Sequence, residues 1–429
     1  MTRIKRLAKE GSWIVAGQIA AVAGALVLVR VLTEHLDPAQ YGQLALGLTV
    51  AGLVNQVVMG GVTNGISRFY SIAAEKQDLG GYLHATRRLM LYATLVVVVI
   101  SLLVITGLFW LGYSQWIALA AAALIFSVLS AYNGTLSGIQ NAARQRAIVA
   151  LHGSLDAWLK IGLALGLMFW LGNSSTAVVI GYACSSLIIS LSQLVFLRRT
   201  IPMQKAQPAK DNQWMQQMWA FSLPFGTWGV FSWMQQVSDR WALQTFAPIA
   251  DVGQYVVVFQ LGYTPIAMVT GVAVSFIAPV LFQRSGDTTD HVRNVNVHRL
   301  TWRIVQISLL FTSLGFLITS MCHEFIFRIL VATAFRGNSY LLPWVVLAGG
   351  VFAAGQVLGI KLASELKTKE QIIPKIVTAL IGMLCNLLGA AYAGMQGVVA
   401  ALVVFSVIHF VWMAWIARHL PTDIKQVTE

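Results

Sequence analysis

The chain contains twelve apolar stretches of about 20 residues or more, divided by short polar segments. At 1.5 Å per residue, about 20 helical residues cross the ~30 Å hydrocarbon core of a bilayer. Only 10% of the residues are charged and 57% are hydrophobic, whereas about 25% are charged in a soluble domain. The sequence therefore predicts an all-α, polytopic membrane protein with twelve transmembrane helices. The stretches cover residues 12–31, 44–66, 89–111, 116–138, 147–171, 176–197, 221–246, 254–282, 302–321, 341–362, 372–393 and 398–417.

The positive charge is distributed in a way that predicts the orientation of these helices. Of the 29 Lys and Arg residues, 24 lie in seven short segments that alternate with nearly uncharged ones. Positively charged residues are retained on the cytoplasmic side during insertion, so we expect both termini and five internal loops there. The net charge of +13 then belongs to loops that lie against anionic lipid, which argues against nucleic-acid binding. The seven segments are 3–9, 68–88, 144–146, 198–210, 284–303, 361–375 and 418–425.

Several classes of chemistry lack their sequence motifs in this chain. It has no phosphate-binding Gly-rich loop with Lys, no His-Glu-x-x-His and no nucleophile elbow, so we expect neither an enzyme nor a bound cofactor. The three cysteines have no metal-ligand spacing and imply no disulfide framework.

The first apolar stretch is too long for a cleaved signal peptide and is expected to be retained. Among the expected outer loops only 322–340 has any length, and its apolar part, 325–334, is expected to be re-entrant or to lie on the membrane surface.

The twelve stretches divide evenly about the polar segment 198–213. We therefore predict an N-terminal six-helix bundle (1–197), a cytoplasmic linker (198–215) and a C-terminal six-helix bundle (216–429). Because each half has an even number of helices, the two copies share one orientation, as in a parallel repeat. Such a repeat suggests a central cavity between the bundles and transport by alternating access.

An internal likeness supports the repeat. Residues 37–44 read Asp-Pro-Ala-Gln-Tyr-Gly-Gln-Leu, and residues 248–255 read Pro-Ile-Ala-Asp-Val-Gly-Gln-Tyr. Alignment of Gly42 with Gly253 places the long second apolar stretch of each half in the same position.

Several short motifs also follow one another in a recognisable order and spacing: Arg30-x-Leu32, Pro38-x-x-Tyr41-Gly42, Gly60-Gly61 with Arg68, Asp239-Arg240-x-x-Leu243, Val252-Gly253-x-Tyr255 and Ala278-Pro279. Over almost the whole chain this pattern resembles the Wzx-type polysaccharide or O-antigen flippases, whose superfamily also contains the multidrug and toxin extruders. The resemblance implies a transporter of the bacterial inner membrane that moves polyprenyl-pyrophosphate-linked oligosaccharides from the cytoplasmic to the outer leaflet. It further implies a role in O-antigen or exopolysaccharide biosynthesis, with a polysaccharide polymerase and a chain-length regulator as partners.

Three basic residues lie within the apolar stretches and are not explained by topology: Arg30, Lys160 and Arg240. A charge at the bilayer centre costs ~3 kcal/mol on insertion scales, so each should face the bundle interior or a water-filled cavity. Under the repeat alignment Arg240 corresponds to position 29, next to Arg30. We hypothesise that both arginines hold the pyrophosphate or acidic sugars of the substrate, because a guanidinium binds phosphate oxygens bidentately. In the alternative, Arg30 reaches the outer interface and Arg240 pairs with Asp239.

The fifth apolar stretch carries His152, Asp156 and Lys160 at successive i, i+4 positions, on one helical face. One interpretation is that Asp156 and Lys160 form a pair that fixes helix packing. In the other, Lys160 contacts the substrate phosphate and Asp156 responds to protons or sodium. Asp156 and Asp239 are the two acidic residues expected within the helices, so they are the candidates for ion coupling.

Amide side chains also occur within the apolar stretches, and Asn55, Gln56 and Gln260 are candidates for substrate binding. Amides bind sugar hydroxyls, but they also join helices by hydrogen bonds. The other amides in such positions are Gln235, Gln236, Gln356 and Asn386.

Three competing functions remain open at this level. The first is an ion-coupled drug or small-molecule antiporter of the extruder branch, which would share the twelve helices. The excess of three intramembrane cations over two acids favours an anionic substrate instead. The second is a polysaccharide polymerase or ligase, which the short outer loops disfavour. The third is a non-transporting assembly subunit, which no feature of the sequence supports.

Overall fold

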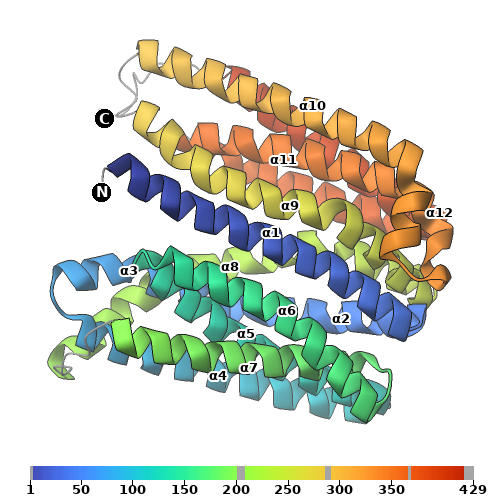
Figure 1. Ribbon diagram of the computed structural model, residues 1–429, viewed down its shortest axis with the longest axis horizontal. Coiled ribbons are helices and arrows are strands. Elements are labelled where there is room, and N and C mark those ends of the chain that lie inside the picture. Colours follow the sequence, from blue (N-terminus) through green and yellow to red (C-terminus); the bar gives the residue numbers. More distant parts are fainter. Residues whose placement is uncertain (1–2, 201–207, 286–290, 366–368, 420–429) are drawn as a thin grey trace. The chain divides into compact units, whose positions relative to one another are not determined.

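A computed structural model describes residues 3–200, 208–285, 291–365 and 369–419. All regular secondary structure in these ranges is helical (Figure 1). The chain divides into two compact units, Met1–Gln236 and Val237–Glu429. The predicted all-α architecture is therefore confirmed.

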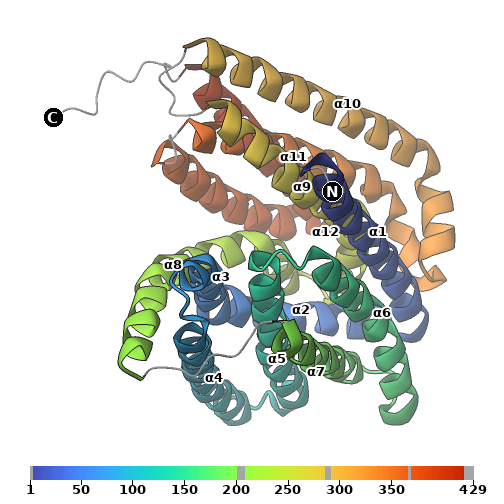
Figure 2. The same ribbon diagram turned by 60° about the vertical axis from the view of Figure 1, so that its left-hand side comes forward.

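The first unit is built around helix α5, which packs against α2, α3, α4, α6 and α7 (Figure 2). Helix α1 packs mainly on α6, and α6 on α7. A π-helical turn, η1, joins α2 to α3 without a break. The elements are α1 (Arg3–His35), α2 (Pro38–Val54), η1 (Asn55–Met59), α3 (Gly60–Glu75), α4 (Leu79–Trp110), η2 (Ser114–Trp116), α5 (Ile117–Ala142), α6 (Arg146–Leu171), α7 (Ser175–Thr200) and the first part of α8 (Pro208–Phe246).

The second unit is built around helix α11, which packs against α9, α10 and α12. A 3₁₀ segment precedes α11, just as η2 precedes α5 in the first unit. The end of α8 begins this unit. The other elements are α9 (Ile249–Ser285), α10 (His291–Leu330), η3 (Thr333–Leu341), α11 (Leu342–Ser364), η4 (Lys369–Gln371) and α12 (Ile372–His419).

Ten helical segments of the described chain are long and apolar enough to cross a membrane. The difference from the twelve expected stretches has two sources. Helix α12 contains two of the stretches, and α8 is too polar over its described length to qualify. The basic segments fall at every second connection between the twelve apolar stretches, as the sequence predicts for one side of a membrane. Three of their lysines, Lys205, Lys367 and Lys425, lie outside the described residues.

Helix α12 is a hairpin of two packed arms. Ala393 and Gly394 leave the helical conformation, and Gly394 has φ +54°, a left-handed conformation that glycine adopts without a steric penalty. The arms approach most closely at Gly389 and Gly397, where a Cβ added to Gly397 would lie 2.0 Å from the Gly389 carbonyl oxygen. Farther along, a Cβ on Gly382 would contact the ring of Phe405. Glycine is therefore required for the close approach of the two arms.

The two units repeat the same buried positions when Gly42 is aligned with Gly253. Leu32 and Leu243 are both buried, and each accepts a backbone hydrogen bond of 2.8 Å, from Leu36 and Ala247 respectively. Leu44 and Tyr255 are also equivalent and buried. The predicted repeat is therefore present in the packing of each unit.

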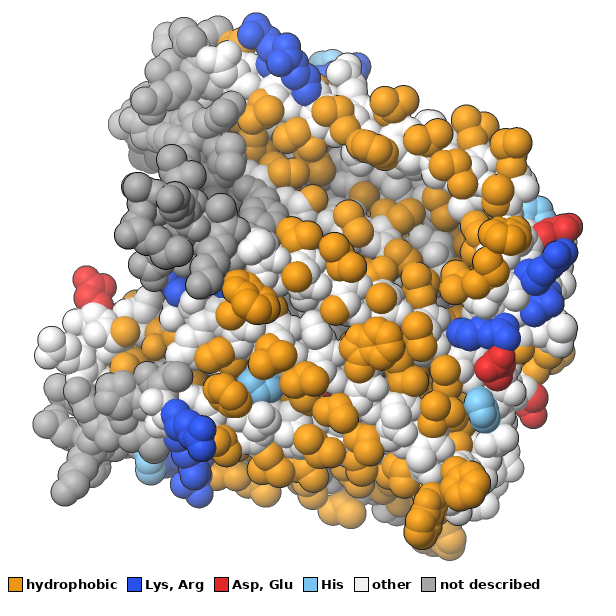
Figure 3. Space-filling model, in the orientation of Figure 1, with side chains coloured by type: hydrophobic (Ala, Val, Ile, Leu, Met, Phe, Trp, Pro, Cys, Tyr) orange, Lys and Arg blue, Asp and Glu red, His pale blue; other side chains and the backbone are white. Residues whose placement is uncertain are grey.

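Large hydrophobic side chains remain exposed along the outer helices. Leu102 and Leu103 of α4 and Leu310 and Phe311 of α10 are each more than 60% exposed. On the face shown in Figure 3, hydrophobic side chains cover the middle of the helices, and charged side chains lie near their ends. This distribution is that of a protein whose solvent is hydrocarbon at mid-depth.

One local expectation differs from the structure. The segment 325–334 is neither re-entrant nor separate, because Phe325 to Leu330 are the last turns of α10, and Arg336 donates to the carbonyls of Val331 and Arg328 at that helix end. The polar segment 198–215 covers the end of α7, residues outside the described chain and the start of α8. The first compact unit ends at Gln236, and the part of α8 that belongs to it packs on α3.

The glycine contact in α12 provides a test of the hairpin. We expect Gly397→Ala to lower the thermal unfolding midpoint in detergent by several degrees, because the added methyl group would overlap the Gly389 carbonyl and overpacking costs about 1–3 kcal/mol. Gly166→Ala in α6, where nothing lies within 4 Å of an added Cβ, should leave the midpoint unchanged or raise it. Equal midpoints for Gly397→Ala and the wild type would contradict the close approach.

Candidate functional site

Arg30 lies near the C-terminal end of α1 and forms an ion pair with Glu34, one turn later. The sequence-based boundary of this helix, residue 31, excluded Glu34, whereas α1 continues to His35. The Nη1 atom of Arg30 is buried and has no hydrogen-bond partner among the described residues. One side of this guanidinium is therefore neutralised, while another side retains donor capacity.

Arg240 lies in the second unit, on the last part of α8, and is held by an aromatic ring. Its guanidinium carbon is 5.2 Å from the centroid of the Phe259 ring, a cation–π contact with α9. Its Nε atom is buried and has no hydrogen-bond partner in the part of the chain that the structure describes. Arg240, like Arg30, thus offers an unused donor within its own unit.

Asp239 is 4% exposed and does not form an ion pair with Arg240 in the described part of the chain. Its Oδ2 accepts a hydrogen bond of 2.6 Å from the Tyr255 hydroxyl, and its Oδ1 accepts one of 2.7 Å from the backbone N–H of Arg240. Neighbouring residues on a helix point in different directions, which explains why Asp239 and Arg240 do not pair. A phenol rather than a cation therefore stabilises this carboxyl group.

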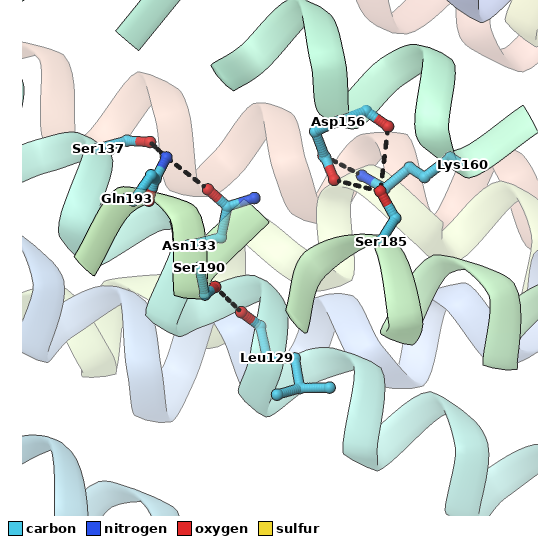
Figure 4. Close-up of polar contacts among 8 residues, drawn as sticks. All are labelled: Leu129, Asn133, Ser137, Asp156, Lys160, Ser185, Ser190 and Gln193. Atoms are coloured by element: carbon cyan, nitrogen blue, oxygen red, sulfur yellow. Dashed lines mark hydrogen bonds and ion pairs between the residues drawn. The ribbon is translucent and has the colours of Figure 1, made fainter. Parts of the chain in front are cut away.

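The polar residues expected on one face of α6, His152, Asp156 and Lys160, include two that form hydrogen bonds with α7 (Figure 4). Lys160 Nζ lies 2.6 Å from Asp156 Oδ2, and the Ser185 hydroxyl donates to Asp156 Oδ1 at 2.9 Å. His152 is buried, and its Nε2 lies 3.0 Å from the Ser192 hydroxyl. Both oxygens of Asp156 are thus occupied. The arrangement is a satisfied pair between α6 and α7 whose proton or charge state would alter the packing of those helices.

A second polar cluster lies between α5 and α7, and the sequence reasoning did not identify it. Gln193 is fully buried, and its Nε2 donates to Asn133 Oδ1 at 3.0 Å and to the Ser137 hydroxyl at 2.8 Å (Figure 4). The Ser190 hydroxyl donates to the Leu129 carbonyl. Buried amides of this kind join helices in a membrane, so we assign this cluster to packing.

The candidate amides lie in different places. Asn55 and Gln56 are half-buried at the start of the π-helical turn η1, and Gln56 bonds to Gln236 of α8. Gln260 is half-buried on α9 in the second unit. The structure therefore brings Gln56 together with Gln236, which the sequence reasoning weighed separately.

Lys361 was grouped with the cytoplasmic basic residues from its position in the sequence, but it is only 2% exposed. Its Nζ lies 2.9 Å from Glu365 Oε1 and donates to the Ala417 carbonyl at 3.1 Å. Lys361 therefore ties the last turn of α11 to the end of α12. The i, i+4 spacing of Lys361 and Glu365 is visible in the sequence and could have indicated the pair.

No group of three or more His, Cys, Asp or Glu side chains in the described ranges is placed to hold a metal ion. The functional chemistry of these ranges consists of guanidinium donors, paired carboxylates and amides in an apolar surrounding.

Comparison with known proteins defines the family. The family model described as polysaccharide biosynthesis protein matches residues 7–285 of this chain. The chain belongs to the polysaccharide biosynthesis protein family. No curated protein sequence matches the chain.

Solved structures with the same fold are membrane transporters. The lipid II flippase MurJ in an inward closed conformation superposes with a TM-score of 0.68 at 14% identity, covering 95% of this chain and 88% of that one. An outward-facing multidrug resistance transporter of the MATE family, in the MOP superfamily, gives a TM-score of 0.61 at 16% identity, with coverage of 95% and 96%. A MOP superfamily transporter from Pyrococcus furiosus gives 0.62 at 14% identity, also with 95% and 96%. At these identities the likeness establishes the fold of this family member and leaves its substrate open.

The buried Lys361–Glu365 pair allows a stability test. We expect Glu365→Leu to destabilise the protein by about 3 kcal/mol, because it leaves a buried ammonium group without its counter-ion. The double variant Lys361→Leu, Glu365→Leu should recover most of that loss, as measured by thermal unfolding in detergent. Glu324→Leu serves as the control, since Glu324 is an exposed carboxylate on α10. A single variant as stable as the wild type would show that the pair does not hold α11 to α12.

Proposed function

We propose that this protein is a Wzx-type flippase that moves polyprenyl-pyrophosphate-linked oligosaccharides from the cytoplasmic to the outer leaflet of the bacterial inner membrane. The family match over residues 7–285 is the observation that carries the proposal. The fold shared with a lipid II flippase supports transport of a lipid-borne substrate. The basic segments support an orientation with both termini in the cytoplasm.

The energetic task of such a protein is solvation. Polar and charged groups without hydrogen-bond partners cost several kcal/mol each in hydrocarbon, and an isolated ion costs tens. A protein that offers hydrogen-bond donors within the membrane replaces the lost water, while the polyprenyl chain stays in lipid. Covalent chemistry is not required, so the proposed activity is transport and not catalysis.

Arg30 and Arg240 are the proposed contacts for the pyrophosphate or for acidic sugars. Each has a buried nitrogen without a hydrogen-bond partner, Nη1 in Arg30 and Nε in Arg240. Each belongs to a different unit. Lys160 is a weaker candidate for phosphate binding, because Asp156 already neutralises it.

The direction of transport has a sufficient physical source. A pyrophosphate carries about two negative charges, and their outward movement is favoured by an inside-negative potential, which releases ~2.3 kcal/mol per charge per 100 mV. Consumption of the product by a polysaccharide polymerase, with its chain-length regulator, would add to this drive. ATP is not needed.

The arginines provide the main test. We expect Arg30→Gln combined with Arg240→Gln to lower the flipping rate at least about tenfold, because the substrate loses two charged donors and 1.4 kcal/mol corresponds to a factor of ten. The measurement is the leaflet distribution of lipid-linked oligosaccharide in a deletion strain that carries each variant, assayed with a membrane-impermeant glycosidase. Arg87→Gln, an exposed arginine on α4, is the matched control.

The same assay separates the competing function. In the deletion strain, substrate confined to the cytoplasmic leaflet supports the flippase. Unchanged outer-leaflet levels would reject it and favour an ion-coupled small-molecule antiporter. That second candidate is supported by the fold shared with a MATE family transporter and by the third intramembrane acid, Glu34, which removes the expected excess of cations over acids.

We also propose that Asp156 and Asp239 couple transport to a proton or sodium gradient. Neutralisation of Asp156 would release Lys160 and the Ser185 hydroxyl. We expect proteoliposomes with the wild-type protein to flip substrate faster under an imposed gradient, and those with Asp156→Asn to keep only the gradient-independent rate. Asp251→Asn, on the first turn of α9, is the control. A wild-type rate that does not depend on either gradient would limit the driving force to the membrane potential.

A further inference from the structure

Two glutamines of the first unit form a short chain of hydrogen bonds that includes none of the charged residues proposed to bind the substrate. Gln56 Nε2 donates to Gln236 Oε1 at 3.2 Å, and Gln236 Nε2 donates to the Ser232 hydroxyl at 3.0 Å. The side chain of Gln236 is exposed, and that of Gln56 is half-buried. We refer to Gln56, Gln236 and Ser232 as the amide cluster.

The depth of the amide cluster makes its exposure informative. Gln56 lies at the middle of the membrane span Pro38–Glu75, and Gln236 lies near the middle of the apolar stretch 221–246. At mid-depth, lipid offers no hydrogen-bond partner, so a polar group that faces it carries the full desolvation cost. Water or a polar ligand on this face of the first unit would supply the hydrogen-bond partners that lipid lacks.

The backbone around the cluster is built to fix its position. The π-helical turn η1 displaces the chain at Asn55–Met59, and such turns are frequent at functional sites. Helix α8 lies directly on this turn, because a Cβ added to Gly229 would be 2.4 Å from the Gln56 carbonyl oxygen. The indole N–H of Trp233 donates to the Thr49 carbonyl at 2.7 Å and holds α8 on α2. The two glutamines are thus presented by rigidly packed backbone.

The cluster retains unused hydrogen-bonding capacity. A glutamine amide has two N–H donors and a carbonyl oxygen that accepts twice, so the two bonds within the cluster use less than half of it. The adjacent Asn55 side chain, which is half-buried, makes no hydrogen bond to any residue in the described part of the chain. Donors and acceptors therefore lie side by side on this face, and none of them is charged.

We propose that the amide cluster is a carbohydrate-binding subsite of the first unit, which binds hydroxyl groups of the substrate's sugars. Hydroxyls both donate and accept, and adjacent amide N–H and C=O groups match that pattern. A phosphate offers acceptors only and is better matched by guanidinium groups. The proposal rests on the proposed function, since it assigns the sugar of the substrate to the amides and the pyrophosphate to the arginines.

Binding measurements with two probes test this division. The first probe is the lipid-linked oligosaccharide that accumulates in membranes of the deletion strain, and the second is polyprenyl pyrophosphate without sugars. We expect Gln56→Leu combined with Gln236→Leu to weaken binding of the first probe by about tenfold or more, and to leave binding of the second within about twofold. Gln216→Leu is the matched control, because Gln216 is an exposed glutamine on the same helix, ~30 Å away at 1.5 Å per residue.

Each outcome decides one of the two proposals. Equal loss for both probes, or no loss for either, in a glutamine variant whose thermal unfolding midpoint matches that of the wild type would overturn the carbohydrate subsite. If the variant is unstable, Gln236→Ala, which only truncates the exposed side chain, replaces it, with the same expected difference between the probes. Failure of the wild-type protein to bind either probe would reject the flippase function itself, whatever the glutamine variants do.

Discussion

Charge in a hydrocarbon solvent is the constraint on which the rest of this structure depends. A lone charge away from water is costly, so the chain neutralises three of its cations with a carboxylate close by in the sequence. Lys160 pairs with Asp156, Lys361 with Glu365 and Arg30 with Glu34, each at i, i+4 spacing. In each case the partner lies one helical turn away in the sequence, before Lys160 and after Arg30 and Lys361, so neutralisation does not depend on the arrangement of other helices.

Arg240 is the exception to this rule. Its acidic neighbour, Asp239, is adjacent in the sequence and points elsewhere, where the Tyr255 hydroxyl stabilises it. The guanidinium lies on the Phe259 ring and keeps a buried nitrogen without a partner. The repeat explains the contrast, because the equivalent positions in the first unit, Leu28 and Val29, are apolar. The second unit therefore adds a charged site to a framework that both units share.

The amides show the same separation between framework and site. Gln193 is fully buried, and its Nε2 donates to Asn133 and Ser137 within the α5–α7 interface, so it contributes to packing. Gln56 and Gln236 bond to each other but remain accessible at mid-depth. Residues of the same chemical type thus serve different purposes, and their exposure at a given depth distinguishes them.

The sequence by itself determined the fold class, the number of apolar stretches, the repeat and the basic segments. Hydrophobic length and charge distribution are local properties of the chain, and they decide which segments enter a bilayer and which stay on one side of it. It also placed Asp156 and Lys160 on one face, since helical periodicity fixes that relation. It did not determine that Lys361 is buried, that Tyr255 holds Asp239 or that Gln56 meets Gln236. Those contacts join residues that are distant in the chain or depend on how tightly helices approach. Only the tertiary structure could decide them, because a hydrophobicity pattern specifies which face is apolar but not which neighbour it meets.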